Sequence, residues 1–274
     1  MKLSCLPVSL FKELDSGEMS IKEWAEYGKG LNLDAIDLMM VNIKSHTPKY
    51  LKTMKTGLDE AGIGIAMITT YPDFTHPCEK QRKREKVYLE NDIAVASQLG
   101  AKFLRVTAGQ AHPETSREDG IKWAIAGLLS VEETAKEFGV ELVYEDHSKP
   151  GGWDYMDFSN PPDIFLEIAK GIKGSSIGIN FDTANILVAG VEKTVEVLEE
   201  VIDQVKTIHV NDITTIGKME TCVIGTGIVP NQEVFKCLKK HGWDNWLCIE
   251  EWGNKGLAGV DQAVATTRKM WAEA

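Results

Sequence analysis

The sequence predicts an α/β fold of the barrel type, a single (β/α)8 TIM-barrel domain over residues 1–274. Three observations predict it. Short apolar runs alternate with stretches of helical period along the whole chain, in eight pairs. Glycines mark the ends of several helical stretches, and the segments after the strands are longer than those before them. A barrel of this kind takes about 250 residues, a length that the chain supplies.

Strands are expected where a few apolar residues run together between turn residues. They cover residues 3–10, 35–40, 64–71, 103–107, 141–145, 177–182, 205–212 and 246–251. The first run, LSCLPVSL, invites comparison with a signal peptide. It contains a proline, follows a single positive charge and precedes no small-x-small cleavage site, so a strand is the better interpretation.

Each strand is followed by a stretch in which apolar residues recur at helical spacing. Helices are expected at residues 20–29, 48–61, 79–99, 117–138, 163–170, 192–203, 231–241 and 259–272. Several of them end at a glycine that should take the left-handed conformation, which a Cβ disfavours. These glycines are Gly30, Gly62, Gly100, Gly139 and Gly242. A strand begins within a few residues of each, which is typical of the short connections at one end of a barrel.

The loops at the other end of the predicted barrel are long and contain Pro, Trp and His. They cover residues 71–77, 109–115 and 148–162. Long loops after the strands are typical of a barrel whose site lies at the strand carboxyl ends. The rival fold is an open doubly wound sheet, and it is not favoured because no Gly-x-Gly-x-x-Gly follows the first strand.

The composition limits the classes of partner. The chain carries a net charge of −11, and an acidic surface repels phosphate backbones, so nucleic acid is not expected as a partner. Apolar runs stay short of the 18 residues that a membrane span needs, so no membrane association is expected. The five cysteines are odd in number, widely spaced and form no Cys-x-x-Cys pair. That pattern is typical of a reducing compartment and predicts a cytoplasmic protein.

Four of the last strands end in an ionisable side chain, at Glu145, Asp182, His209 and Glu250. Because the carboxyl ends of barrel strands meet at one mouth, these side chains should converge there. Strand alternation supports this for Glu250, which shares a face with Trp246 and Cys248, while Leu247 and Ile249 face the outer helices. Glu251 should then lie outside the mouth.

Two Glu, one Asp and one His form an oxygen-rich ligand set for one divalent metal ion. Carboxylates with a single imidazole suit Mn²⁺, which is the expected ion, and also Mg²⁺ or Co²⁺; Zn²⁺ stays open without a thiolate. A carboxylate that ends a single strand usually caps a helix or faces solvent. The four groups at equivalent positions on successive strands indicate a site instead.

These strand ends resemble the xylose-isomerase-like TIM-barrel superfamily of sugar isomerases and epimerases. The resemblance covers nearly the whole chain and is most specific in four segments, Tyr144-Glu-Asp-His147, Phe181-Asp-Thr-Ala-Asn185, Ile208-His-Val-Asn-Asp212 and Gly225-Thr-Gly227 leading to Glu250. Within this superfamily the chain resembles the tagatose/psicose 3-epimerases and inosose isomerases. This resemblance implies that four residues bind the metal, namely Glu145, Asp182, His209 and Glu250. It also implies that Glu145 and Glu250 are the catalytic acid/base pair, moving a proton through an enediolate.

The resemblance further implies a small carbohydrate substrate, and it leaves a homo-oligomer open. Substrate contacts are expected from His147, Trp153, Asn185 and Asp212. Arg105, a charge inside an apolar strand, should either hold a substrate anion or pair with a barrel carboxylate.

Two positions depart from the epimerase pattern, since Asn185 stands where those enzymes carry His and Thr215 where they carry Arg. Endonuclease IV, the nucleic-acid branch, needs further His ligands for a three-metal cluster, and Asn185 occupies one of those positions. The departures leave two alternatives to an isomerase or epimerase. One is a metal-dependent dehydratase or lyase acting on a hydroxy-keto compound, and the other is a non-catalytic barrel subunit.

Overall fold

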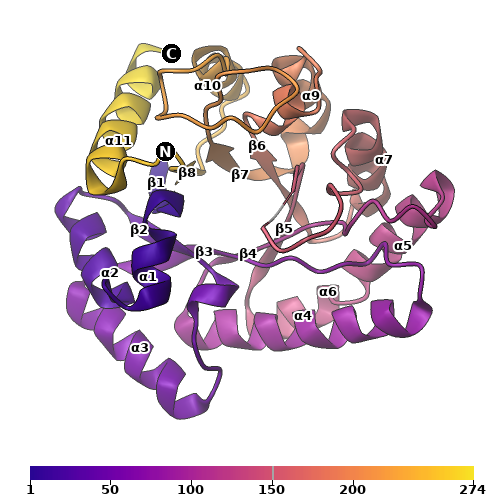
Figure 1. The fold of residues 1–274 in the computed structure, drawn as a ribbon, viewed down its shortest axis with the longest axis horizontal. Helices are drawn as coiled ribbons and strands as arrows, with labels where there is room; N and C mark the ends of the chain where they lie inside the picture. Colours follow the sequence, from indigo (N-terminus) through magenta and orange to yellow (C-terminus); the bar gives the residue numbers. More distant parts are fainter. Residues whose placement is uncertain (150) are drawn as a thin grey trace.

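A computed structural model describes residues 1–149 and 151–274. Within these residues, eight parallel strands form one sheet in the order β1-β8-β7-β6-β5-β4-β3-β2, rolled into a barrel (Figure 1). The strands are β1 (Lys2–Leu6), β2 (Ala35–Met39), β3 (Gly64–Thr69), β4 (Phe103–Val106), β5 (Glu141–Glu145), β6 (Gly178–Asp182), β7 (Val205–Val210) and β8 (Trp246–Glu250). The predicted (β/α)8 TIM barrel is confirmed.

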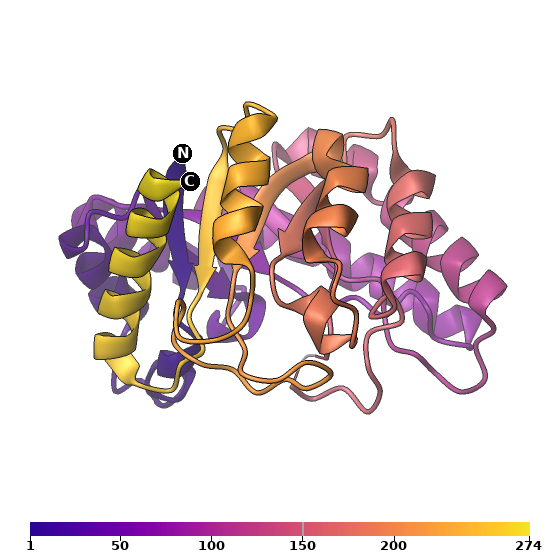
Figure 2. The same ribbon diagram turned by 90° about the horizontal axis from the view of Figure 1, so that it is seen from above.

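Helices surround the strands as an outer ring (Figures 1 and 2). The longer ones are α2 (Ile21–Gly30), α3 (Pro48–Ala61), α4 (Glu79–Leu99), α5 (Arg117–Leu129), α6 (Glu132–Phe138), α7 (Pro162–Ile172), α9 (Thr194–Val201), α10 (Asn231–Lys240) and α11 (Gly256–Glu273). Figure 2 shows the long post-strand loops gathered at the end of the barrel opposite both termini. This arrangement places the strand carboxyl ends beneath those loops.

Some elements differ from the predicted ones. The first strand ends at Leu6, and the chain continues as a 3₁₀ turn (Val8–Leu10) and a short helix, α1 (Phe11–Ser16). Pro7 explains the early end, because it has no N–H to donate to a sheet. The predicted helix 117–138 is two helices, and the Ser130 hydroxyl at the break donates to the carbonyl of Gly127. A further short helix, α8 (Asn185–Val188), was not expected.

Four of the five predicted helix-ending glycines have the left-handed conformation, namely Gly62, Gly100, Gly139 and Gly242. The prediction for Gly30 is wrong. Gly30 is the last residue of α2, and Asn32, with a φ of 57°, makes the left-handed turn instead. Asn is the residue besides glycine that takes this conformation most readily, because its short side chain can bond locally.

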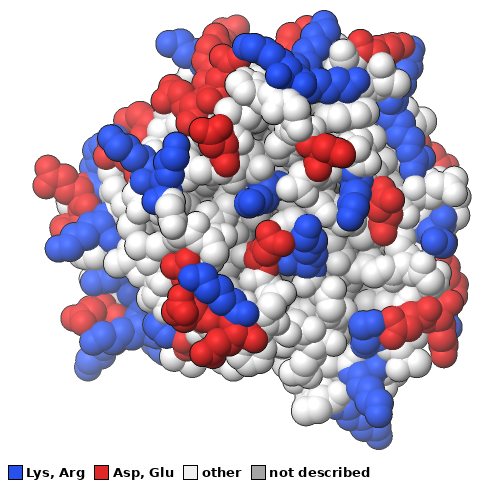
Figure 3. Space-filling view, turned by 180° about the vertical axis from the view of Figure 1, so that it is seen from behind, with Lys and Arg blue, Asp and Glu red and all other residues white. Residues whose placement is uncertain are grey.

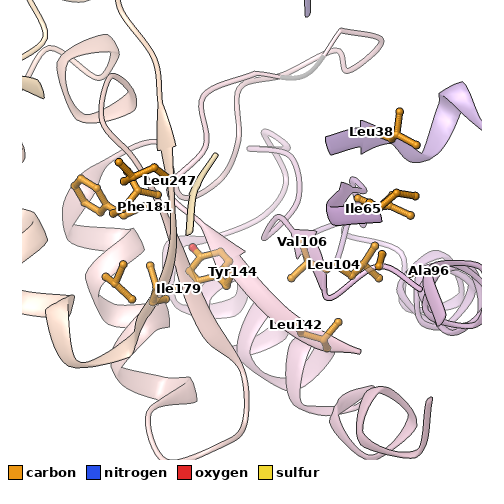
Figure 4. Close-up of a cluster of buried hydrophobic side chains, with 14 of the residues drawn as sticks. Leu38, Ile65, Ala96, Leu104, Val106, Leu142, Tyr144, Ile179, Phe181 and Leu247 are labelled. Carbon is orange, nitrogen blue, oxygen red and sulfur yellow. The ribbon is translucent and has the colours of Figure 1, made fainter. Parts of the chain in front are cut away.

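Strand alternation divides the core into two layers. Outward side chains such as Leu104, Leu142, Phe181 and Leu247 pack between the sheet and the helices (Figure 4). Inward side chains form a separate cluster that fills the barrel: Ala35, Ala66, Met67, Phe103, Val143, Trp246 and Cys248. The predicted inward direction of Trp246 and Cys248 is confirmed, and it directs the polar residues further along the same faces toward the mouth.

The seam between β1 and β2 is joined in part by carboxylates. The N–H of Leu3 donates to Asp34 Oδ2 at 2.8 Å, and the hydroxyl of Ser4 donates to Asp37 Oδ2 at 2.5 Å. On the other side of β2, the register with β3 shifts between Ile36 and Asp37, and the N–H of Met67 there donates to Asp37 Oδ1 at 2.9 Å. Burial raises the pKa of Asp37 to about 7.

The face of the molecule opposite to that of Figure 1 carries charged side chains of both signs. Figure 3, which views this face, shows acidic and basic side chains interspersed. None of the helices in the described residues combines the length and apolar character needed to cross a membrane.

Candidate active site

Three of the predicted metal ligands meet at the mouth of the barrel. Glu145 ends β5, Asp182 ends β6 and His209 lies near the end of β7. The strand register pairs Asp182 with His209 and places Glu145 beside Asn180. One ligand atom from each of Glu145, Asp182 and His209 lies within 4.8 Å of the other two, and all three side chains are fully buried.

A row of inward-facing polar side chains holds Glu145 in place. The amide of Asn180 donates to Glu145 Oε1 at 2.5 Å, and the hydroxyl of Thr207 donates to Asn180 Oδ1 at 2.6 Å. Nδ1 of His209 lies 2.5 Å from the same Glu145 oxygen. The carboxylate is therefore fixed by neighbours from β6 and β7.

Two polar atoms of the cluster lack the partners that burial normally demands. Asp182 Oδ2 and His209 Nε2 are buried and have no hydrogen-bond partner among the described residues. The other oxygen of Asp182 accepts the N–H groups of Ala184 and Asn185, at 2.7 and 3.0 Å. Buried polar atoms are nearly always satisfied, and two carboxylates with an imidazole are suitable ligands for a divalent cation. The cluster can therefore hold a metal ion.

Arg105 is buried beside the cluster and pairs with a barrel carboxylate. Its Nε lies 3.2 Å from Glu145 Oε2, and neither side chain is measurably open to solvent. Burial alone would raise the pKa of Glu145, but the charges of Arg105 and His209 outweigh it and lower the pKa to about 2. Of the two roles expected for Arg105, the structure shows the pairing with a carboxylate.

Tyr71 lies two residues after the end of β3, and the sequence did not indicate it as a site residue. Arg105 lies 4.4 Å from the centre of its ring and donates to its hydroxyl at 3.0 Å. His147 and Trp153 both pack edge-on against the same ring, with centroid distances of 5.8 and 6.4 Å. Tyr71 thus joins two predicted substrate contacts to the ion pair with Glu145.

His147 also lies close to the cluster, with Nε2 3.8 Å from Glu145 Oε2. Burial lowers the pKa of His147 to about 3, so its imidazole is neutral near pH 7. A neutral imidazole has one donor and one acceptor nitrogen, which suits contact with a hydroxyl group.

Glu250 stands beside the cluster of three rather than within it. It ends β8 and is only partly buried. The amide of Asn211 donates to its Oε2 at 2.9 Å. Burial raises the pKa of Glu250, opposite to the direction for Glu145. The role of Glu250 as a fourth ligand is still a prediction.

The side chains of the other two residues predicted to contact substrate, Asn185 and Asp212, form hydrogen bonds with backbone groups. The amide of Asn185 donates to the carbonyl of Asp146 at 2.8 Å. Asp212 has both carboxylate oxygens engaged by N–H groups of the loop after β7; the donors are Ile213, Gly225, Gly227 and Val229. These bonds fix the carboxylate of Asp212 against the loop after β7. The substrate contacts expected of Asn185 and Asp212 are still predictions.

The comparisons with known proteins agree with this geometry. Residues 25–272 match the family described as "Xylose isomerase-like TIM barrel". The chain belongs to the xylose isomerase-like TIM-barrel family. The predicted resemblance is therefore confirmed.

Proteins similar to this chain carry different activities in their names. Inosose dehydratase of Clostridium botulinum (strain Alaska E43 / Type E3) is 23% identical over an alignment of 229 residues, and the match covers 74% of each chain. D-psicose 3-epimerase of Clostridium cellulolyticum H10, solved with D-tagatose, superposes with a TM-score of 0.79 at 13% identity over 99% of both chains. The IolI protein with a bound zinc atom superposes with a TM-score of 0.76 at 17% identity, over 100% of this chain and 97% of that one.

Membership of the xylose isomerase-like family places the chain among enzymes that modify sugars and related compounds.

Four residues that the sequence did not indicate complete the site, namely Tyr71, Asn180, Thr207 and Asn211. Asn180 and Thr207 carried a signal, because each lies two residues before a predicted ligand on the same strand face. Asn211 lies two residues after His209, just beyond the end of β7, and Tyr71 had no such signal because it lies in the loop after β3.

Proposed function

We propose that the chain is a divalent-metal-dependent isomerase or epimerase of a small sugar, keto-sugar or polyol. The observation that carries this proposal is the buried group of Glu145, Asp182 and His209 at the barrel mouth, which could hold a metal ion and has Glu250 on the neighbouring strand β8. The pKa values of Glu145 and Glu250 are displaced in opposite directions. Carboxylates in unlike environments can take unlike roles in one reaction. Mn²⁺ is the proposed ion, with Mg²⁺, Co²⁺ and Zn²⁺ as alternatives.

Glu145, Asp182 and His209 would hold the metal, with Glu250 as the proposed fourth ligand. A bound divalent ion supplies a Lewis acid, which makes a proton next to a carbonyl easier to remove. Asn180 and Arg105 keep Glu145 ionised and oriented, so Glu145 can accept a carbon-bound proton. Asn211 fixes one oxygen of Glu250 and leaves the other to exchange a proton with substrate.

The position of the returning proton decides the product. If Glu250 returns a proton to the same carbon from the other face, the sugar is epimerised. If the proton returns to the neighbouring carbon, an aldose and a ketose interconvert. The aromatic group of Tyr71, His147 and Trp153 offers ring faces and an imidazole for the substrate's carbon skeleton and hydroxyl groups.

The test is turnover of a panel of ketohexoses and inososes by Glu145→Gln and Glu250→Gln. Gln keeps the shape and one acceptor oxygen but cannot serve as the proton acceptor, so both variants should lose turnover by a factor of about 10² or more. Both should still fold, Glu145→Gln with lower stability because it leaves Arg105 without its partner. Glu251→Gln is the matched control. It lies next to Glu250, and its carboxylate accepts the N–H of Gly253, a bond that Gln can keep.

Reactions in D₂O provide a second reading, because an epimerase or isomerase that exchanges its proton with solvent incorporates deuterium at carbon. Full activity of either Gln variant on the true substrate would rule out the two-carboxylate mechanism.

The alternative is a dehydratase, and the named inosose dehydratase relative favours it. The same two carboxylates could then remove a carbon-bound proton and protonate a departing hydroxyl group. Product mass separates the two reactions, since an isomer keeps the mass of the substrate and a dehydration product lacks one water. A non-catalytic subunit would turn over none of these compounds and would not need to bind stoichiometric metal after mild chelation.

A further inference from the structure

A second group of metal-ligating side chains lies on the outer wall of the barrel, away from the mouth. It combines Glu199 on α9 with Cys237 on α10 and His241, the residue that follows α10, and one ligand atom from each lies within 4.8 Å of the others. Helices α9 and α10 lie side by side in Figures 1 and 2. The group therefore bridges the helix that follows β6 and the helix that follows β7.

Helical spacing brings Cys237 and His241 to one face. They are four residues apart, and the N–H of His241 donates to the carbonyl of Cys237 at 3.2 Å, so the helical turn continues through both. Glu199 faces them from α9, with Oε1 4.0 Å from the Cys237 sulfur and 3.9 Å from His241 Nε2. One carboxylate oxygen thus approaches both side chains of the pair.

The three side chains match the ligand chemistry of zinc. A thiolate, an imidazole and a carboxylate are its usual protein ligands, and its tetrahedral geometry places neighbouring ligand atoms about 3.3–3.6 Å apart. The distances of 4.0 and 3.9 Å therefore need to shorten by about 0.5 Å. Glu199 and His241 can make this adjustment, because their side chains are 44% and 36% exposed.

Lys240 is the present partner of the carboxylate. Its Nζ lies 3.0 Å from Glu199 Oε1, and its side chain is 69% exposed. Exposed ion pairs of this kind contribute little to stability, so a divalent cation can displace the ammonium group into solvent. Burial and the neighbouring Glu199 raise the pKa of Cys237; a bound zinc ion would favour the thiolate and release the proton.

We propose that Glu199, Cys237 and His241 form a second metal site, selective for zinc and other thiolate-binding divalent ions, with water as the fourth ligand. The site fastens α9 to α10 and takes no part in the chemistry at the mouth. Because it contains a thiolate, Mn²⁺ and Mg²⁺, which prefer oxygen ligands, should leave it free. The chain would then bind two equivalents of zinc but one of Mn²⁺.

The test uses Co²⁺ as a spectroscopic probe of the full chain after removal of metal by a chelator. Thiolate coordination gives a near-ultraviolet sulfur-to-cobalt charge-transfer band, which a site made of carboxylates and imidazole cannot produce. The wild type should show this band at an intensity of one thiolate per chain. Cys237→Ser should abolish it, and Cys222→Ser, which changes another cysteine outside the group, should leave it intact.

Two further variants separate coordination from folding. His241→Gln replaces an exposed ligand. It should raise the Co²⁺ concentration at which the band reaches half of its full intensity by a factor of about ten or more. Asp182→Asn weakens the site at the mouth and should leave the band unchanged, so the result is independent of the proposed enzymatic function. A wild-type protein without the band in excess Co²⁺, or a Cys237→Ser protein that keeps it, would overturn the proposal.

Discussion

Replacing Arg105 with Met should be among the most damaging single changes in the barrel. Arg105 Nε and Glu145 Oε2 lie 3.2 Å apart, and neither side chain is exposed by more than 1%. At an effective dielectric constant of about 20, unit charges at this distance attract by about 5 kcal/mol. Removing one partner of a buried pair leaves the other charge unsolvated and costs about 3–5 kcal/mol.

Because of His209, the expected loss of unfolding free energy lies toward the lower end of the range of about 3–5 kcal/mol. Burial opposes its charge, but Glu145 outweighs burial and raises the pKa of His209 to about 9, so a second cation remains beside Glu145 in the metal-free protein at neutral pH. We expect Arg105→Met to lower the free energy of unfolding by about 3 kcal/mol.

A double-mutant cycle measures this coupling. Urea unfolding, followed by circular dichroism in the presence of a chelator, gives the free energies of the wild type, Arg105→Met, Glu145→Gln and the double variant. In the double variant neither charge is left without a partner, because both have been removed. Its loss of unfolding free energy should therefore be smaller than the sum of the two single losses, by about 2 kcal/mol. A loss under about 1 kcal/mol for Arg105→Met, or strictly additive losses, would refute the reasoning.

Three other predictions concern the seam and the loops. Burial raises the pKa of Asp37 to about 7, so the folded chain holds this proton more tightly than the unfolded chain, and stability falls by about 4 kcal/mol as pH rises from about 4 to 7. Asp37→Asn lacks this loss, and urea unfolding at pH 5 and pH 8 should show its advantage over the wild type growing with pH; a constant difference would contradict the assignment. Asn211→Ala removes the hydrogen bond to Glu250 and should lower kcat about a hundredfold with little change in KM, whereas an unchanged kcat in steady-state kinetics would exclude a positioning role. Gly227→Ala places a Cβ against the carboxylate of Asp212 and should lower the free energy of unfolding by about 2 kcal/mol, so a thermal melt that matches the wild type would show that the loop accommodates the methyl group.

The features that the sequence could predict follow from local rules. Alternation of apolar runs and helical stretches is sufficient for the barrel, and the strand ends identify Glu145, Asp182 and His209 because parallel strands all end at one mouth. The inward direction of Glu145 follows from strand alternation, since Val143, two residues earlier on β5, belongs to the inward cluster.

The features that it could not predict depend on contacts between distant segments. The amide of Asn211, in the loop after β7, donates to Glu250, a contact that the sequence did not indicate; the role of Glu250 as a fourth ligand is still a prediction. The sequence left two roles open for Arg105, binding a substrate anion or pairing with a carboxylate. The pairing of β4 with β5 places Arg105 next to Glu145 and shows the second. Near Gly30, the left-handed residue is Asn32. Glycine can also continue a helix, so its presence in the sequence does not fix the position of the left-handed turn.

The strand order has a consequence for how the chain could be re-connected. Among the described strands, β1 pairs with β8 through a parallel register, while β2 to β7 each pair with the next strand along the chain. Both chain ends lie on the same side of the barrel (Figure 2). A circular permutant that starts at β2 and carries β1 after β8 would make every hydrogen-bonded pair of strands consecutive in sequence. The long closure between first and last strand would become a local one, and local pairing speeds folding.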